Sequence, residues 1–173
     1  MGGTKNKRSG TALGDIGMEI YLMRHGEAES KREGTTDDAR RLTKHGEDQV
    51  RKNLAFAKEN LGARIDLILS SPLTRAKQTA NIAADLFAVK QSSVDGSLAP
   101  ESAPYEIYAA LSKIDPSFSK SVLLVTHQPL VSHLLEDLVR SSRIAMSPAS
   151  LAKITTTEGE PRSQAGTLIW LLP

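Results

Sequence analysis

Histidine and arginine side chains follow three short apolar runs of this 173-residue chain. Arg24 and His25 follow the first run, Arg75 lies five residues after the second, and His127 follows the third. An arginine guanidinium is always charged and can bind two phosphate oxygens at once. A neutral imidazole beside a phosphate can attack phosphorus, or can donate a proton or a hydrogen bond. These four residues therefore predict phosphoryl-transfer chemistry, provided that the fold brings the three runs together.

Metal binding is the main competing use of histidine. A metal site needs about three His, Asp or Glu ligands, often spaced as HxH or HExxH. The chain has neither spacing and has no cysteine, and the arginines beside the histidines would repel a cation. We therefore expect no metal site, and we expect His45 to be exposed and His133 to be a partly buried packing residue. A nucleotide site of the Walker type is not supported either, because no G-x-x-x-x-G-K stretch occurs.

The segments that carry these residues alternate between strand and helix patterns. Apolar runs predict strands, and apolar residues at helical spacing predict helices. The expected strands are 18–23, 66–70, 122–126, 149–157 and 167–172, and the expected helices are 44–61, 72–87 and 129–139. Strands alternating with helices predict an α/β fold with a largely parallel sheet. Ligands of such sheets bind at the carboxyl ends of the strands, so the four residues should meet at one edge.

Helix boundaries also have sequence signals. Thr43 is a plausible N-cap and Gly62 a plausible stop for the first helix. For the second helix we expect Ser71 as the cap with Pro72 at the first helical position, and for the third we expect a start at Pro129. The N-termini of these two helices would lie at the predicted edge, where their N–H groups and dipoles favour an anion.

Three stretches in order resemble the histidine phosphatase superfamily: MRHGEAE at 23–29, SSPLTRAKQTA at 70–80 and VTHQP at 125–129. Two further stretches, RRLTKHG at 40–46 and LAPESAP at 98–104, are most similar to the small SixA-type phosphohistidine phosphatases. The resemblance spans 18–173. It implies a three-layer α/β sandwich like that of phosphoglycerate mutase, with a mostly parallel central sheet flanked by helices.

The resemblance also implies a role for each matching residue. His25 would be the nucleophile that becomes phosphorylated, and Arg24 and Arg75 would hold the phosphoryl oxygens. His127 would bond the phosphoryl group and stabilise its charge during transfer. Arg40 either joins this phosphate pocket or is a surface residue. No metal and no organic cofactor is implied.

The general acid is less well defined. Larger members of the superfamily supply a carboxyl group from the middle of the chain, and the matching stretch SVDGSLAPES has no acid that aligns cleanly. Asp37 is our first candidate, and Asp38, Glu27 and Glu101 are the others. An imidazole is easier to expel than an alkoxide, so a phosphohistidine phosphatase would need the acid less.

The leading functional interpretation is a phosphatase that forms a covalent phosphohistidine and acts on phosphohistidine in a protein such as a phosphotransfer domain. The chain is too short for capping insertions, which favours an open pocket that admits a protein-borne side chain. The alternative enzyme is a small-molecule phosphatase for a phosphate monoester or pyrophosphate. An alternative of another class is a non-catalytic module that binds phosphorylated ligands, which the pair of histidines disfavours.

Composition limits the partners and the compartment. The chain is 39% hydrophobic and 24% charged, which is typical of a globular domain. Its net charge of +2 comes from residues 1–17, which we expect to be a flexible basic tail before a catalytic domain over 18–173. The rest has 19 basic and 19 acidic residues, which argues against nucleic-acid binding. No apolar run approaches the roughly 20 residues of a membrane span. We expect a cytoplasmic protein, because a signal peptide and cysteines are both absent.

Overall fold

A single six-stranded sheet forms the centre of the computed structural model, which describes residues 16–31, 33–34, 36–115, 119–157 and 161–173. The strand order is β3-β2-β4-β1-β5-β6. The strands are β1 (Ile16–Arg24), β2 (Leu67–Ser70), β3 (Gln91–Val94), β4 (Ser121–Thr126), β5 (Leu151–Thr157) and β6 (Gly166–Leu172). The first four in chain order are parallel, and β5 and β6 add two antiparallel strands at one edge. The predicted mostly parallel sheet is confirmed.

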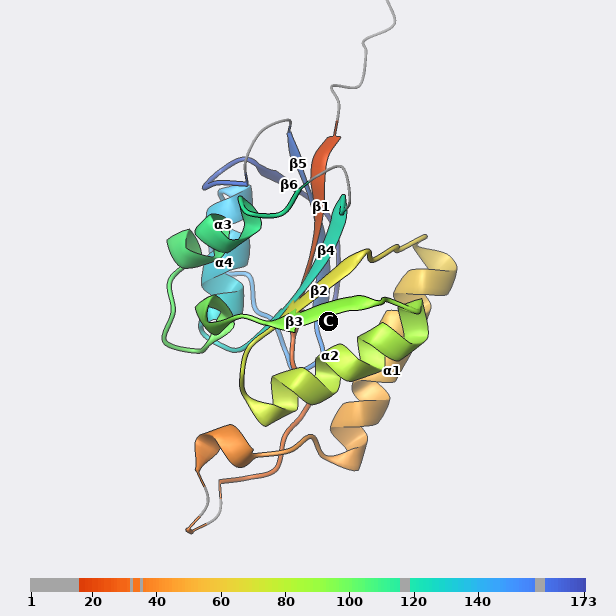
Figure 1. Cartoon of the computed structure of the whole chain (residues 1–173), viewed down its shortest axis with the longest axis vertical. Coiled ribbons are helices and arrows are strands. Elements are labelled where there is room, and N and C mark those ends of the chain that lie inside the picture. The colour runs from red at the N-terminus through yellow and green to blue at the C-terminus, as the bar shows by residue number, and fades with distance from the viewer. Residues whose placement is uncertain (1–15, 32, 35, 116–118, 158–160) are drawn as a thin grey trace, which may run out of the picture.

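Helices cover both faces of the sheet, as the three-layer prediction requires (Figure 1). They are α1 (Lys44–Asn60), α2 (Thr74–Phe87), α3 (Pro104–Leu111) and α4 (Leu130–Val139). Side chains of β1 alternate between the two faces. Tyr21 and Met23 pack with the apolar faces of α1 and α2, and Ile20 and Leu22 pack with those of α3 and α4. Two buried cores therefore hold the central strands from opposite sides. No described helix has the length and apolar character needed to cross a membrane.

The carboxyl ends of the three central strands coincide. Arg24 of β1 pairs with Thr126 of β4, and Ser70 of β2 pairs with Val125 of β4. The backbone keeps this register one residue further, because His25 N donates to Thr126 O at 3.1 Å and Ser71 N donates to Val125 O at 3.0 Å. The residues that follow these strands therefore begin at one edge, as predicted.

The ends of the first helix agree with the sequence signals. The Thr43 hydroxyl accepts from Gly46 N at 2.9 Å, which confirms Thr43 as the N-cap of α1. Gly62 follows the C-cap residue Leu61 and has φ of +62°, a left-handed conformation that glycine adopts without strain.

The start of the second helix was predicted wrongly. α2 begins at Thr74 with Leu73 as its N-cap residue, and not at Pro72 with Ser71 as the cap. The Ser71 hydroxyl lies 2.7 Å from the ring of His127, so it serves the histidine and not the helix end. At the third helix Pro129 is the N-cap residue and α4 begins one residue later. Strand β3 (QSSV) was not predicted, since its four side chains are exposed and a single valine makes no apolar pattern.

Candidate active site

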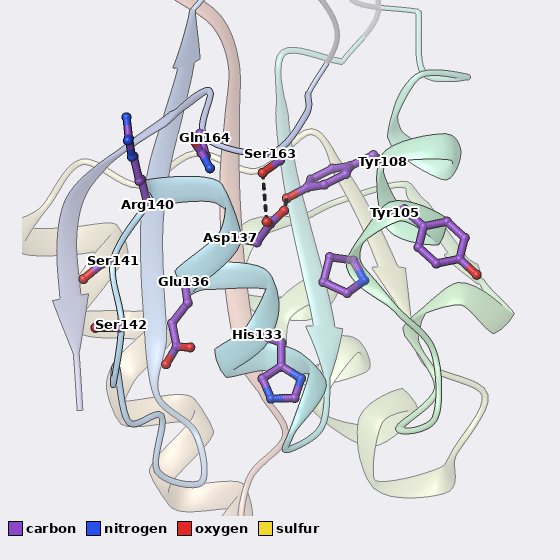
Figure 2. Close-up of a pocket in the computed structure, with 11 residues that line it drawn as sticks. Tyr105, Tyr108, His133, Glu136, Asp137, Arg140, Ser141, Ser142, Ser163 and Gln164 are labelled. Atoms are coloured by element: carbon purple, nitrogen blue, oxygen red, sulfur yellow. Dashed lines mark hydrogen bonds between the residues drawn. The ribbon is translucent and has the colours of Figure 1, made fainter.

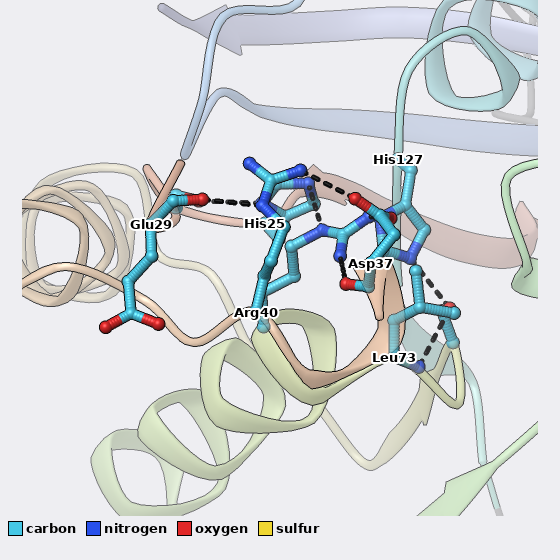
Figure 3. Close-up of polar contacts among 9 residues, drawn as sticks. His25, Glu29, Asp37, Arg40, Leu73 and His127 are labelled. Carbon is cyan, nitrogen blue, oxygen red and sulfur yellow. Dashed lines mark hydrogen bonds and ion pairs between the residues drawn. The ribbon is translucent and has the colours of Figure 1, made fainter. Parts of the chain in front are cut away.

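Two histidine rings meet at the carboxyl end of the sheet. His25 and His127 are both buried, and their ring centroids lie 4.9 Å apart at an interplanar angle of 55°. Asp37 lies beside these rings (Figure 3), and Arg75 is hydrogen-bonded to both His25 and Asp37. Side chains that directly follow β1 and β4 thus meet others from the start of α2 and the turn η1 (Asp37–Ala39), although 102 positions separate the two histidines in sequence.

The contacts of His25 define which of its nitrogens can act. Nδ1 lies 2.7 Å from the carbonyl oxygen of Gly26, which can only accept, so Nδ1 carries the proton. Nε2 accepts from Nε of Arg75 at 3.2 Å. Burial, together with the positive charges of Arg75, Arg24 and Arg40, lowers the pKa of His25 to about 4. At neutral pH the ring is therefore neutral and has its lone pair on Nε2, facing the Arg75 guanidinium.

Asp37 holds two arginines together. Its Oδ2 lies 2.8 Å from a terminal nitrogen of Arg75, and its Oδ1 lies 2.8 Å from one of Arg40. The Arg40 hydrogen bond is the main cause that lowers the pKa of the Asp37 carboxyl, and Arg75 adds to it. These contacts favour the carboxylate, which accepts hydrogen bonds, over the carboxylic acid that a proton donor must be. Arg40 is thereby connected to the site through Asp37, and its positive charge contributes to the lowered pKa of His25.

His127 and Arg24 each carry a buried nitrogen that has no hydrogen-bond partner among the described residues. For His127 this atom is Nδ1, while Nε2 contacts Ser71 Oγ at 2.7 Å. For Arg24 it is Nε, while one terminal nitrogen donates to the Met146 carbonyl oxygen at 2.9 Å. Buried polar atoms are usually paired. Each of these two nitrogens therefore lacks the partner that an oxygen of a bound anion would supply.

Close backbone packing fixes the loop that carries His25. A Cβ atom on Gly26 would lie 2.5 Å from the carbonyl oxygen of Gly46 and 2.8 Å from Cγ2 of Val50. A Cβ atom on Gly46 would overlap the Glu27 carbonyl oxygen. The loop after β1 therefore rests on the first turn of α1 through two glycines. Sequence reasoning missed Gly46, and the available signal was a glycine in the first turn of a predicted helix.

The other candidate acids have different surroundings. Glu27 is exposed and accepts from the Thr43 hydroxyl at 2.9 Å, and Asp38 and Glu101 are exposed. Asp95, in the middle stretch of the chain, accepts from Ser97 N at 2.9 Å at the start of the turn η2 (Gly96–Leu98). Among the described residues, none of these four carboxylates is hydrogen-bonded to His25 or His127. Asp37 is linked to His25 through the guanidinium of Arg75.

The two remaining histidines lie outside this cluster. His45 is exposed at the start of α1, as predicted. The prediction that His133 is partly buried is wrong, because it is exposed. α4 turns Leu130, Leu134 and Leu138 toward the core, and His133 lies off that stripe.

His133 lines an open groove of about 1040 Å³ between α3 and α4 (Figure 2). There Asp137 accepts from the Tyr108 hydroxyl and from the Ser163 hydroxyl, the latter at 2.8 Å. Within the described part of the chain, no group of three or more His, Asp or Glu residues could hold a metal ion. The residues that line the groove include neither His25 nor His127, so the groove and the two-histidine cluster are separate features of the molecule.

Comparison with known proteins agrees with this arrangement. Residues 20–97 match the family model of the histidine phosphatase superfamily, branch 1. A phosphohistidine phosphatase SixA homolog of Haemophilus influenzae is 32% identical over 145 residues, which are 79% of this chain and 87% of that protein. Phosphohistidine phosphatase SixA of Escherichia coli is 29% identical over 158 residues, 88% of this chain and 92% of that protein. The structure of the protein histidine phosphatase SixA complexed with tungstate superposes with a TM-score of 0.78 at 28% identity, covering 90% of this chain and 96% of that one. The chain therefore belongs to the histidine phosphatase superfamily, as a SixA-type member.

Proposed function

We propose that this phosphatase removes the phosphoryl group from phosphohistidine on a protein, such as a phosphotransfer domain, through a covalent intermediate on His25. The observation that carries the proposal is the state of His25: its proton is fixed on Nδ1 by Gly26, and its Nε2 lone pair faces a guanidinium. The SixA relatives, whose names state this activity, support the substrate.

The first step forms a bond between His25 Nε2 and phosphorus. The bond from phosphorus to the substrate nitrogen breaks, and its electron pair stays on the departing imidazole, which takes up a proton from solvent. In the second step a water molecule attacks phosphorus and gives up one proton to solvent, the bond to Nε2 breaks with its electron pair returning to Nε2, and phosphate leaves. One water is consumed per phosphohistidine, and His25 returns to its neutral form.

The surrounding side chains stabilise the transferring group. Arg75 and Arg24 supply the charge that phosphoryl oxygens need, and His127 Nδ1 supplies a further hydrogen bond. Asp37 holds the Arg75 guanidinium in place, and Arg40 pairs with the same carboxylate. Positioning and electrostatics account for the mechanism, as is usual for phosphoryl transfer.

Rapid-quench labelling tests the proposal. A phosphotransfer domain carrying radioactive phosphohistidine should pass its label transiently to the wild-type enzyme, and the label should be acid-labile and map to His25. His25→Ala should abolish both labelling and turnover. His133→Ala, which removes an exposed histidine of the separate groove, should preserve both. Full turnover in His25→Ala, or label on another residue, would refute the proposal.

A further inference from the structure

The Ser71 hydroxyl forms a buried link between the start of α2 and the ring of His127. Ser71 is fully buried, and its Oγ lies 2.7 Å from His127 Nε2. The same oxygen accepts a longer hydrogen bond, of 3.4 Å, from the backbone N–H of Leu73, the N-cap residue of α2. With Leu73 as the donor to Oγ, the hydroxyl hydrogen is free to point at His127.

The ring of His127 holds one proton at neutral pH. Burial is the main cause that lowers its pKa to about 3, and the neighbouring His25 and Arg75 act in the same direction. A neutral imidazole carries its proton on Nδ1 or on Nε2, and the hydrogen bond made by one nitrogen decides the state of the other. A hydroxyl that donates to Nε2 requires a lone pair there, and leaves the proton on Nδ1.

We propose that Ser71 is a positioning residue that keeps the proton of His127 on Nδ1, so that the ring presents an N–H to the phosphoryl group. Nδ1 is the buried nitrogen that has no partner among the described residues. In the other tautomer Nδ1 would present a lone pair to phosphoryl oxygens, which would repel them. This role rests on the proposed function, in which His127 binds the transferring group.

Nitrogen NMR of the ligand-free enzyme tests the tautomer without any turnover. Protonated and unprotonated ring nitrogens have widely separated ¹⁵N shifts, so the wild-type spectrum should show His127 Nδ1 protonated and Nε2 unprotonated. Ser71→Ala should move both shifts toward an average as the two tautomers mix. Ser70→Ala, at the neighbouring buried serine, is the matched control and should leave them unchanged. Protonated Nε2 in the wild type, or an unchanged His127 spectrum in a folded Ser71→Ala, would overturn the proposal.

A double-mutant cycle separates this role from simple packing. Ser71→Ala should lower kcat roughly tenfold, less than the 10²–10³-fold expected for losing a charge-stabilising donor outright. His127→Asn keeps an amide donor near the position of Nδ1 but has no atom at Nε2, so Ser71 has nothing left to orient. In that background Ser71→Ala should have little further effect on kcat. An equal loss of kcat in both backgrounds would overturn the proposal for Ser71. The covalent step is tested separately by His25→Ala, so the proposed function does not depend on the outcome of this cycle.

Discussion

Asp37 binds the Arg75 guanidinium through two of its own atoms. Its carboxylate Oδ2 and its backbone carbonyl oxygen each accept from a different terminal nitrogen of Arg75 at 2.8 Å. Nε of the same guanidinium donates to His25. Arg75 is buried, while Asp37 is partly exposed at the site's margin. The turn η1 thus fixes the plane of the arginine that faces the nucleophile.

Replacing Asp37 distinguishes an anchor from a proton donor. Asp37→Asn should lower kcat about tenfold through a less firmly held Arg75, and should do so equally for substrates with good and poor leaving groups. The expected cause is misplacement of the guanidinium, because the neutral amide cannot pair with two cations. Glu59→Gln, at an exposed acid of α1, is the control. A loss confined to alkyl phosphates, measured as kcat/KM across both classes, would instead show that Asp37 is the general acid.

Removing either arginine of the proposed phosphate site should slow turnover by roughly 10²–10³-fold, the scale for one preorganised charge-stabilising donor. Arg75→Lys should be almost as slow as Arg75→Ala, because an ammonium group cannot contact His25, Asp37 and an oxyanion at once. Arg51→Ala, at an exposed arginine of α1, is the matched control. A crystal soaked in vanadate should show the anion touching Arg24, Arg75 and His127. An anion bound elsewhere while this cluster stays empty would count against the site.

The close contact between Gly26 and Gly46 predicts that the enzyme tolerates no side chain at Gly26. Gly26→Ala would force a methyl group to within 2.5 Å of the Gly46 carbonyl oxygen, so the loop or α1 must shift. We expect a loss of about 1–3 kcal/mol in the free energy of unfolding, the usual cost of overpacking, together with reduced turnover. Gly96→Ala, where a Cβ would meet nothing within 4 Å, should change neither quantity. Urea unfolding and kcat measured on the same samples would check both, and a fully active, fully stable Gly26→Ala would show that the contact is unimportant.

Burial of the two histidines predicts how stability and rate depend on pH. Burial lowers the pKa of His25 to about 4 and that of His127 to about 3, against 6.5 for the unfolded chain. Between pH 6.5 and 4 the unfolded state therefore takes up protons that the folded state does not, so folding stability should fall as pH falls through this window. Over the same window kcat for an aryl phosphate should stay nearly level, because His25 remains neutral. Urea unfolding at pH 7 and 4.5 should show a smaller change in the free energy of unfolding for His25→Gln than for the wild type. A kcat that halves near pH 6.5 would contradict the lowered pKa of His25.

The sequence was sufficient to predict the parts of the site that lie on regular elements. His25, Arg75 and His127 follow strands or begin a helix, and the parallel order of the strands brings their ends to one edge. The Ser71–His127 and Asp37–Arg75 contacts could not be predicted, because they join residues 56 and 38 positions apart through side-chain conformations that no periodicity encodes. Strand β3 could not be predicted for a different reason. An exposed edge strand needs no apolar residues, so its sequence has no apolar pattern to detect.

The state of the carboxyl groups leads to a prediction about the leaving group. An alkoxide needs a general acid, whose absence costs roughly 10²–10⁴-fold in rate, whereas an imidazole departs with little help. In the ligand-free site Asp37 is held as a carboxylate by Arg40 and Arg75, so it is poorly suited to donate a proton. We therefore expect kcat/KM for phosphohistidine on a phosphotransfer domain to exceed that for an alkyl phosphate by a similar factor. Among aryl phosphates, kcat/KM should fall steeply as the pKa of the leaving phenol rises, with His25→Ala giving the background rate. A flat dependence would reveal a working acid, and a kcat/KM that favours a sugar phosphate over phosphohistidine would make the small-molecule phosphatase the better assignment.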